Sequence, residues 1–340
     1  MTLKKYMGIT AMVCGMLGAS VSSAIAADYN LRFAHPWPGG SDIHKGLAAW
    51  SDSLTEASDG RIKVEFYPAQ TLAKAAKAYD AVVNQVADMT ATVQGYSANR
   101  YPLTQVIELP GMVASGSQGS CILQTLYDDG DIAAEYDDTH VLFVWTNGAG
   151  HLHMNGKKVL KPEDIAGLRI RRPTTVVGQL LQDLGAKPVG MPAPDAYTAL
   201  QRGVIDGVAI SWDGAKVFRL NDVVDSHTEL NLYSLSFVVT MNKDVYQRLP
   251  EDLQRVIDDH SGQKWSQYMA KIFDRVDHES RIDAKAMGDE VIEFDTAIQQ
   301  AWRPALVKAT DNYLDELESK DLPARAVYAK AKELRQHCET

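Results

Sequence analysis

Apolar and polar positions follow two periods along this chain, and the order of those periods predicts its elements. Residues 29–38 predict a strand with its exit loop, and residues 62–67 alternate as a half-buried strand does. Apolar residues at helical spacing lie between them at 43–54 and after them at 78–86. The chain therefore begins β-α-β-α, which predicts a parallel sheet with helices on both faces.

The pattern continues to a point where the composition loosens. Residues 87–93 predict the next strand, residues 119–136 have helical spacing, and residues 140–145 form a strongly apolar strand. Glycines then cluster at 148–150, and we expect the chain to cross there into a second lobe.

The second lobe repeats the same order of elements. Strands are predicted at 167–172, 187–191 and 204–210, with a helix after each of the first two. The apolar segment 235–241 is expected to carry the chain back. We therefore predict an α/β, two-lobe fold with a central sheet flanked by helices in each lobe. Its divisions are 27–148 plus about 237–276 for lobe I, and 149–236 plus about 277–340 for lobe II.

Residues 251–286 predict a long helix across both lobes. The segment has no proline and a single glycine, Gly262, and its apolar residues recur at nearly helical period. One unbroken helix there spans about 54 Å. The alternative is a kink at Gly262. The remainder of the chain is helical in composition, and we expect it to lie on the second lobe.

The amino-terminal segment has the pattern of a secretory signal peptide. Lys4 and Lys5 precede an apolar run at 9–17, and Ala24-Ile-Ala26 matches a cleavage site. The alternative is a retained membrane anchor, but the run is shorter than the roughly 20 residues that span a bilayer. We expect residues 1–26 to be removed and the protein to be exported to the periplasm.

Charge and cysteine content narrow the class of partner. The formal charge is −10, and removal of two lysines with residues 1–26 makes it −12. An acidic surface disfavours nucleic acid and anionic membranes as partners. Cys121 and Cys338 remain, and an exported protein allows either a disulfide between them or two free thiols.

The strongest candidate for ligand binding is an arginine on the strand 167–172. Arg169 and Arg171 point to the same side of that strand, and Arg171 stands near its carboxyl end, just before Pro173. Ligands of open α/β sheets bind at that end. A guanidinium there suits a carboxylate, phosphate or sulfonate.

Other candidates lie in the loops that follow predicted strands. An aromatic group there favours a ligand with an apolar or aromatic body. Asp213 repels a carboxylate unless it holds an amine, a hydroxyl or a metal ion. The candidates are His35, Trp37, Gln94, Tyr96, Asn147, Ser211, Trp212 and Asp213.

Two further patterns concern metals and catalysis. His151 and His153 share one face of any strand there, which fits either a metal pair or hydrogen bonding, and no third metal ligand is evident nearby. No cofactor is predicted, and the sequence leaves open whether a cation binds together with the ligand. The sequence lacks the nucleophile-elbow, zinc-protease, P-loop and dinucleotide-binding motifs, which argues against an enzyme.

Three longer motifs resemble the solute-binding proteins of TRAP (tripartite ATP-independent periplasmic) transporters. They are residues 100–110, residues 167–173, and residues 185–192 continuing through 197–207, with a weaker match at 242–253. The resemblance implies a two-lobe periplasmic fold that closes on its ligand, with a long helix across both lobes. It also implies delivery to a membrane permease that is driven by an ion gradient.

The same resemblance assigns roles to individual residues. It implies that Arg171 pairs with a ligand carboxylate, while Arg169 and Arg172 do not. His151 stands where some sialic-acid-binding members have an arginine, which suggests another ligand and makes His151 a candidate helper of Arg171. We expect a monomer that binds a small organic acid anion. The alternatives are a binding subunit of an ATP-driven or sensory system and an exported enzyme.

Overall fold

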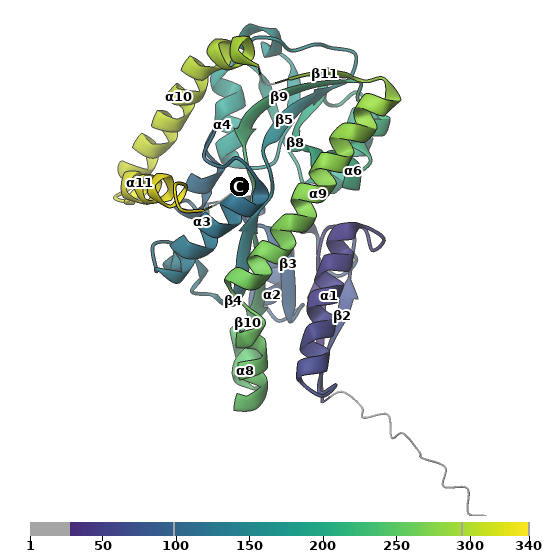
Figure 1. Ribbon diagram of the computed structural model, residues 1–340, viewed down its shortest axis with the longest axis vertical. Helices are drawn as coiled ribbons and strands as arrows, with labels where there is room; N and C mark the ends of the chain where they lie inside the picture. The colour runs from purple at the N-terminus through teal and green to yellow at the C-terminus, as the bar shows by residue number, and fades with distance from the viewer. Residues whose placement is uncertain (1–27, 98, 294, 339–340) are drawn as a thin grey trace, which may run out of the picture.

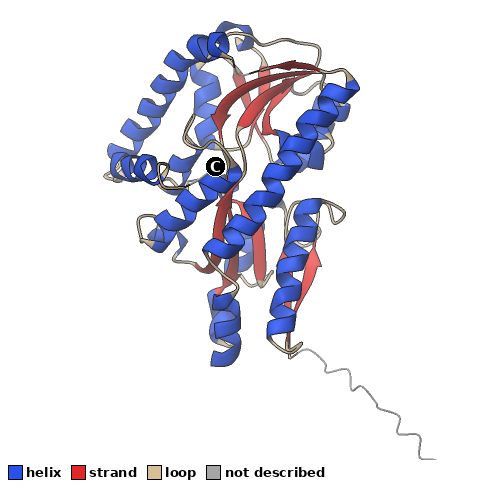
Figure 2. Cartoon of the chain, in the orientation of Figure 1, coloured by secondary structure: helices blue, strands red, loops and turns tan. Residues whose placement is uncertain are grey.

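Two β-sheets with helices on either side organise the chain in the computed structural model (Figure 2). The structure describes residues 28–97, 99–293 and 295–338. The predicted signal peptide lies outside the described residues. The two sheets define two lobes, which confirms the predicted fold class.

The sheet of lobe I has the order β2-β1-β3-β10-β4. β1 is parallel to β2 and β3, as the β-α-β-α pattern predicts, but β10 is antiparallel to both of its neighbours. The strands are β1 (Tyr29–Ala34), β2 (Ile62–Tyr67), β3 (Met89–Val93), β4 (Thr139–Thr146) and β10 (Ser236–Asn242). The helices are α1 (Asp42–Ala57), α2 (Ala78–Val83), α3 (Gly116–Asp128), α7 (Lys243–Gln247) and α8 (Glu251–Asp259), with 3₁₀ turns η1 (Ala75–Lys77), η2 (Gln94–Tyr96), η3 (Thr104–Glu108) and η4 (Ala133–Tyr136).

The sheet of lobe II has the order β11-β9-β5-β8-β6-β7. β6 is parallel to β7 and β8, whereas β5 is antiparallel to β8 and β9. The strands are β5 (Gly150–Met154), β6 (Arg169–Arg172), β7 (Lys187–Gly190), β8 (Gly207–Ser211), β9 (Ser226–Tyr233) and β11 (Glu290–Ile292). The helices are α4 (Thr175–Asp183), α5 (Ala193–Gln201) and α6 (Trp212–Val217), with 3₁₀ turns η5 (Pro162–Ile165) and η6 (Leu220–Asp222).

The chain crosses between the lobes where the glycine cluster predicts. β4 belongs to the first sheet and β5 to the second, so the first crossing covers residues 147–149. The second crossing, residues 234–235, joins β9 to β10 and returns the chain to lobe I as predicted.

The prediction of one helix over residues 251–286 is wrong, because the chain breaks at Gly262. α8 ends at Asp259, and α9 (Gln263–Met287) begins after Gly262, whose φ of 72° and ψ of −155° favour glycine. The Gly262 amide donates to the carbonyl of Leu142 in β4 at 2.7 Å, which holds the break against the sheet. The alternative prediction, a kink at Gly262, thus named the right residue, but the helix ends there completely and does not merely bend.

α9 still reaches both lobes. Its 25 residues span about 37 Å. It lies against α1 and α3 of lobe I and against α6 of lobe II (Figure 1). Polar contacts fix it to each lobe, with Asp274 accepting from the Ser117 amide and Asp277 accepting from the Asp213 amide.

The carboxyl-terminal helices divide between the lobes. α10 (Thr296–Glu318) lies against α4 and β9 of lobe II, as expected. α11 (Ala324–Leu334) departs from that expectation, because it packs on α3 and η3 of lobe I. A disulfide between Cys121 of α3 and Cys338, with 5.8 Å between the Cα atoms, holds it there and decides between the two cysteine alternatives.

No helix within the described ranges has the length and apolar character that crossing a membrane requires.

Candidate functional site

Arg171 is fully buried where the two lobes meet. It lies near the carboxyl end of β6, as predicted, between β7 and β8. Its Nε donates to the carbonyl of Met191 at 2.9 Å, and Nη1 donates to the carbonyl of Ala209 at 3.0 Å. Nη2 donates to the hydroxyl of Tyr96 in lobe I at 3.3 Å. Backbone carbonyls therefore hold the guanidinium in one orientation.

The charge of Arg171 has no anionic partner within the described part of the chain. All three of its hydrogen bonds go to uncharged oxygens, and no carboxylate forms an ion pair with it. A buried charge is costly unless an opposite charge accompanies it. A bound anion would supply that charge.

Arg171 lines a cavity whose walls come from both lobes. The cavity volume is about 30 Å³, far below the roughly 300–1,000 Å³ of ligand pockets. The cavity in this arrangement is therefore too small for an organic acid. The lining residues are Pro36, Trp37, Val93, Tyr96, Asn147, Arg171, Ala193, Ile210, Ser211, Asp213, Gly214, Phe218, Leu235, Phe237 and Phe273.

Tyr96 links the two walls of the cavity. Its hydroxyl accepts the Arg171 donation and also the amide N–H of Ala193, at 2.9 Å. Tyr96 belongs to η2 of lobe I, whereas both donors belong to lobe II. The same tyrosine therefore contacts Arg171 and ties the lobes together.

A polar cluster forms another side of the cavity. Asn147 Nδ2 donates to Ser211 Oγ at 2.8 Å and to Asp213 Oδ1 at 3.5 Å. Asn147 Oδ1 accepts from the Leu235 amide at 2.8 Å. Asn147 and Leu235 both lie in interlobe crossings, so the cluster joins the crossings to the start of α6.

Asp213 at this cluster favours its protonated form. Burial raises the pKa of Asp213 to about 7, against smaller opposing effects of the hydrogen bonds from Ser211 and Asn147. Burial, followed by the charge of Asp213, also raises the pKa of Asp277 well above its usual range. A neutral Asp213 does not repel a carboxylate and can donate a hydrogen bond to it.

An aromatic group forms the remaining wall. The ring of Trp37 lies 5.9 Å from Phe237 and 6.0 Å from Phe273, and Phe237 lies 5.2 Å from Phe273. Trp145 stacks behind Phe237 at 5.1 Å without lining the cavity. This wall suits an apolar or aromatic ligand body.

The structure brings six of the ten predicted site residues to this cavity. They are Arg171, Trp37, Tyr96, Asn147, Ser211 and Asp213.

The other four predicted residues lie outside the cavity and have partners of their own. His35 Nε2 hydrogen-bonds His44 Nδ1 at 3.0 Å, and burial together with His44 lowers the pKa of His35 to about 3. Gln94 donates to the hydroxyl of Tyr136. Trp212 donates to Glu229 at 3.1 Å.

His151, the expected helper of Arg171, also lies outside the cavity. Its Nδ1 accepts the Leu230 amide at 3.2 Å. Burial lowers the pKa of His151 to about 4, against a smaller opposing effect of Glu229. This imidazole is therefore neutral from pH 5 to 8 and adds no charge to Arg171.

The two histidines of β5 do not form a metal pair in this arrangement. His153 Nδ1 hydrogen-bonds His227 Nδ1 at 2.7 Å, and His153 Nε2 bonds the carbonyl of Ile210 at 3.0 Å. Both ring nitrogens are thus occupied. Across the described ranges no group of three or more histidine, cysteine or acidic side chains has the arrangement of a metal site.

The neighbouring arginines have structural contacts, in line with the roles that the sequence suggests. Arg169 forms a two-point ion pair with Asp206, at 3.1 and 3.0 Å, at the exposed first residue of β6. Arg172 lies over Gly178 and Gly190, where an added Cβ would fall within 3 Å of its side chain. Neither lines the cavity.

Sequence reasoning missed the apolar half of the site. Phe237 stands on a strand that the sequence predicts, and Phe273 stands on the long helix. Both have the pattern of core residues, so the sequence offers no local signal that sets them apart. Phe218 and Ile210 were missed for the same reason.

The chain matches one protein family and is similar to known proteins over most of its length. The family model described as bacterial extracellular solute-binding protein, family 7, matches residues 33–316. A curated relative from Escherichia coli K12, the 2,3-diketo-L-gulonate-binding periplasmic protein, is 26% identical, and the match covers 93% of this chain and 94% of the relative.

Two solved structures are similar over nearly the full length. One is a marine-metagenome TRAP solute-binding protein specific for aromatic acid ligands, in complex with 3-hydroxybenzoate. It is 30% identical, with a TM-score of 0.88 over 93% of this chain and 100% of that one. The other is a TRAP solute-binding protein from Rhodoferax ferrireducens in complex with benzoate. It is 29% identical, with a TM-score of 0.86 over 91% and 98% of the two chains.

Proposed function

Because this chain belongs to the bacterial extracellular solute-binding proteins of family 7, we propose that its ligand is a small monocarboxylate with an aromatic or apolar body. TRAP solute-binding proteins bind small organic acids and work with membrane permease components, and this chain is one of them. It is a transport protein and not an enzyme, and neither an ATP-driven nor a sensory system is favoured.

The observation that carries the proposal is the buried guanidinium of Arg171 without a described counter-charge. In the proposed complex the ligand carboxylate pairs with Arg171, and Tyr96 contacts the same group from lobe I. Because the ligand would then contact both lobes, its binding favours the closed arrangement. A ligand shifts that equilibrium only by binding the closed form better.

The aromatic wall of Trp37, Phe237 and Phe273 supports the apolar part of the proposal. The similar proteins that bind benzoate and 3-hydroxybenzoate point to the same ligand class. Asn147 and Ser211 are proposed to contact a hydroxyl or carboxylate oxygen of the ligand. The proposed site therefore has a charged end, a polar side and an aromatic side.

We also propose that the protein works in the periplasm as a monomer that delivers its ligand to a TRAP permease. TRAP solute-binding proteins are periplasmic. The disulfide between Cys121 and Cys338 supports an oxidising compartment for this chain.

A thermal-shift and calorimetric screen tests the proposed ligand class. Benzoate, 3-hydroxybenzoate and mandelate are compared with glucuronate, which is a carboxylate with a polar body, and with benzyl alcohol, which has no charge. An acid at 100 times its dissociation constant stabilises the folded protein by about 2.7 kcal/mol. We expect stabilisation by the aromatic acids alone. Tighter binding of glucuronate, or equal binding of benzyl alcohol, would contradict the proposal.

A further inference from the structure

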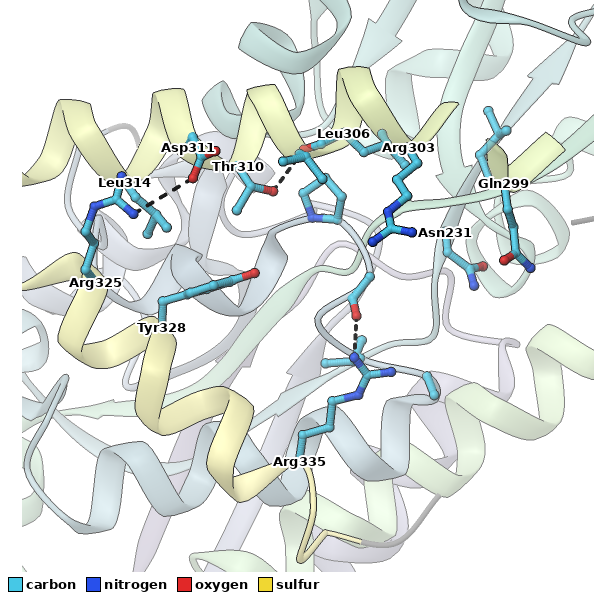
Figure 3. A pocket seen from close by; sticks show the side chains of 16 residues that line it. Asn231, Gln299, Arg303, Leu306, Thr310, Asp311, Leu314, Arg325, Tyr328 and Arg335 are labelled. Carbon is cyan, nitrogen blue, oxygen red and sulfur yellow. Dashed lines mark hydrogen bonds and ion pairs between the residues drawn. The ribbon is translucent and has the colours of Figure 1, made fainter. Parts of the chain in front are cut away.

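A second cavity lies away from the interlobe site, between α10 and α11 (Figure 3). Its volume is about 430 Å³, which is within the range of small-molecule pockets. Residues 110–114 close it on one side, and Leu230 and Asn231 of β9 contribute to its lining. It shares no lining residue with the Arg171 cavity.

Cationic side chains dominate the charge of this cavity. Arg303, Arg325 and Arg335 line it together with one carboxylate, that of Asp311. Arg325 pairs with Asp311 and with Asp315. Arg303, by contrast, makes no hydrogen bond or ion pair with any residue that the structure describes.

Arg335 is only partly engaged. Its Nη1 donates to the carbonyl of Gly111 at 2.8 Å, which leaves its other guanidinium nitrogens without a described partner. Figure 3 shows the guanidinium groups of Arg303 and Arg335, and the hydroxyl of Tyr328, directed toward the middle of the cavity. Two positive charges without carboxylate partners thus converge there, in a chain whose formal charge is −10.

Much of the rest of the lining is apolar, and Asn231, Gln299 and Thr310 are its polar members. Val307 lines the cavity and is 52% exposed. Covering this apolar side chain with a ligand is more favourable than leaving it in contact with water. The apolar side chains are Pro110, Val113, Leu230, Leu306, Val307 and Leu314. Cationic groups beside a continuous apolar wall match a ligand with one anionic end and one apolar end.

The walls of the cavity are held in place before any ligand binds. The disulfide at Cys338 fixes the segment after α11 to α3, three residues beyond Arg335. Gln118 Nε2 donates to the carbonyl of Cys338 at 3.2 Å, and the Gly111 amide donates to the carbonyl of Asn231 at 3.3 Å. A pre-formed cavity costs less ordering entropy when a ligand binds.

We propose that this cavity is a second binding site, which takes an amphipathic organic monoanion such as an alkyl carboxylate or sulfonate. Arg303 and Arg335 pair with the anionic group, Tyr328 donates to it, and the apolar wall covers the alkyl body. The site is independent of the proposed transport ligand, since it uses no residue of the Arg171 cavity.

The test measures octanoate binding by calorimetry to the full chain carrying Arg171→Ala, so that the interlobe site does not contribute. We expect one equivalent of octanoate to bind, and octane-1-sulfonate to bind likewise, with neutral 1-octanol at least about tenfold weaker because it lacks the charge. Arg303→Ala or Arg335→Ala, added singly, should weaken octanoate binding at least about tenfold.

Lys308→Ala is the matched control. It removes one positive charge from the exposed side of α10 and does not line the cavity. It should leave octanoate affinity within about twofold, because a surface charge outside the cavity is screened from the ligand. Circular dichroism of each variant verifies folding, which Arg303→Ala should preserve because Arg303 has no described partner. Absence of octanoate binding, equal binding of octanol, or equal affinity of the Arg303→Ala and Lys308→Ala proteins would overturn the second site without affecting the role of Arg171.

Discussion

Replacement of Arg171 tests the proposed transport site most directly. Arg171→Ala removes the buried guanidinium and leaves the carbonyls of Met191 and Ala209 without their donors. Arg171→Lys keeps a positive charge but cannot reproduce three donations in fixed directions. Both variants should therefore bind an aromatic carboxylate more weakly than the natural protein.

The expected magnitude follows from the hydrogen bonds that a carboxylate would lose. A hydrogen bond to a charged group contributes about 1.5–3 kcal/mol, and about 1.4 kcal/mol corresponds to tenfold in affinity. Loss of one bond predicts a weakening of at least about tenfold for Arg171→Lys, and loss of a two-point pair predicts roughly a hundredfold or more for Arg171→Ala. The free energy of unfolding of the unliganded Arg171→Ala protein should decrease by less than the free energy of ligand binding does, since removing a buried charge also removes its desolvation cost.

Isothermal titration with 3-hydroxybenzoate measures the effect, and circular dichroism verifies that each variant is folded. Arg169→Ala is the matched control, because Arg169 lies on the same strand and pairs with Asp206 at the surface. It should leave affinity within about twofold. If Arg171→Ala and Arg169→Ala bind equally well while both stay folded, the assignment of Arg171 is refuted.

Three further predictions concern pH, covalent structure and side-chain packing. Affinity for a carboxylate should fall roughly three- to tenfold from pH 6 to 8, because the anion binds better while Asp213, whose pKa is raised to about 7, keeps its proton. Calorimetric titrations of Asp213→Asn should show no such fall, and a fall that persists in that variant would contradict the prediction. Reduction of the Cys121–Cys338 disulfide should lower the free energy of unfolding by about 2 to 5 kcal/mol. Denaturant titration with and without reductant measures this change, and an unchanged midpoint would contradict formation of the disulfide. Gly150→Ala should destabilise the fold by about 1–3 kcal/mol, because an added Cβ would lie 2.3 Å from the Tyr233 ring. Gly40→Ala is the control and should not destabilise the fold, because the space around Gly40 is open; equal melting temperatures of the two variants would argue against the Tyr233 contact.

The sequence by itself determined much of the order of elements and the candidate arginine, but it did not predict β9 or β11. Strand and helix periods arise from short-range geometry, so β1, β2, β6 and both interlobe crossings could be predicted from local patterns. The strand that ends before Pro173 allowed Arg171 to be placed near the carboxyl end of β6, and the family resemblance, not the strand geometry, set it apart from Arg169 as the candidate for ligand binding. The break at Gly262 could be suggested but not decided, since a glycine within a helical pattern permits both outcomes.

Only the tertiary structure decided which side chains share a cavity with Arg171. Phe237 and Phe273 have the pattern of core residues, and they line the site because β10 and α9 meet there from distant parts of the chain. His151 lies outside the cavity, where its ring nitrogen accepts the Leu230 amide of the neighbouring strand β9. The pairing of Cys121 with Cys338 likewise depends on the position of α11 against α3. Whether side chains far apart in the sequence come together depends on how the elements pack, and local hydrophobic periods do not determine that packing.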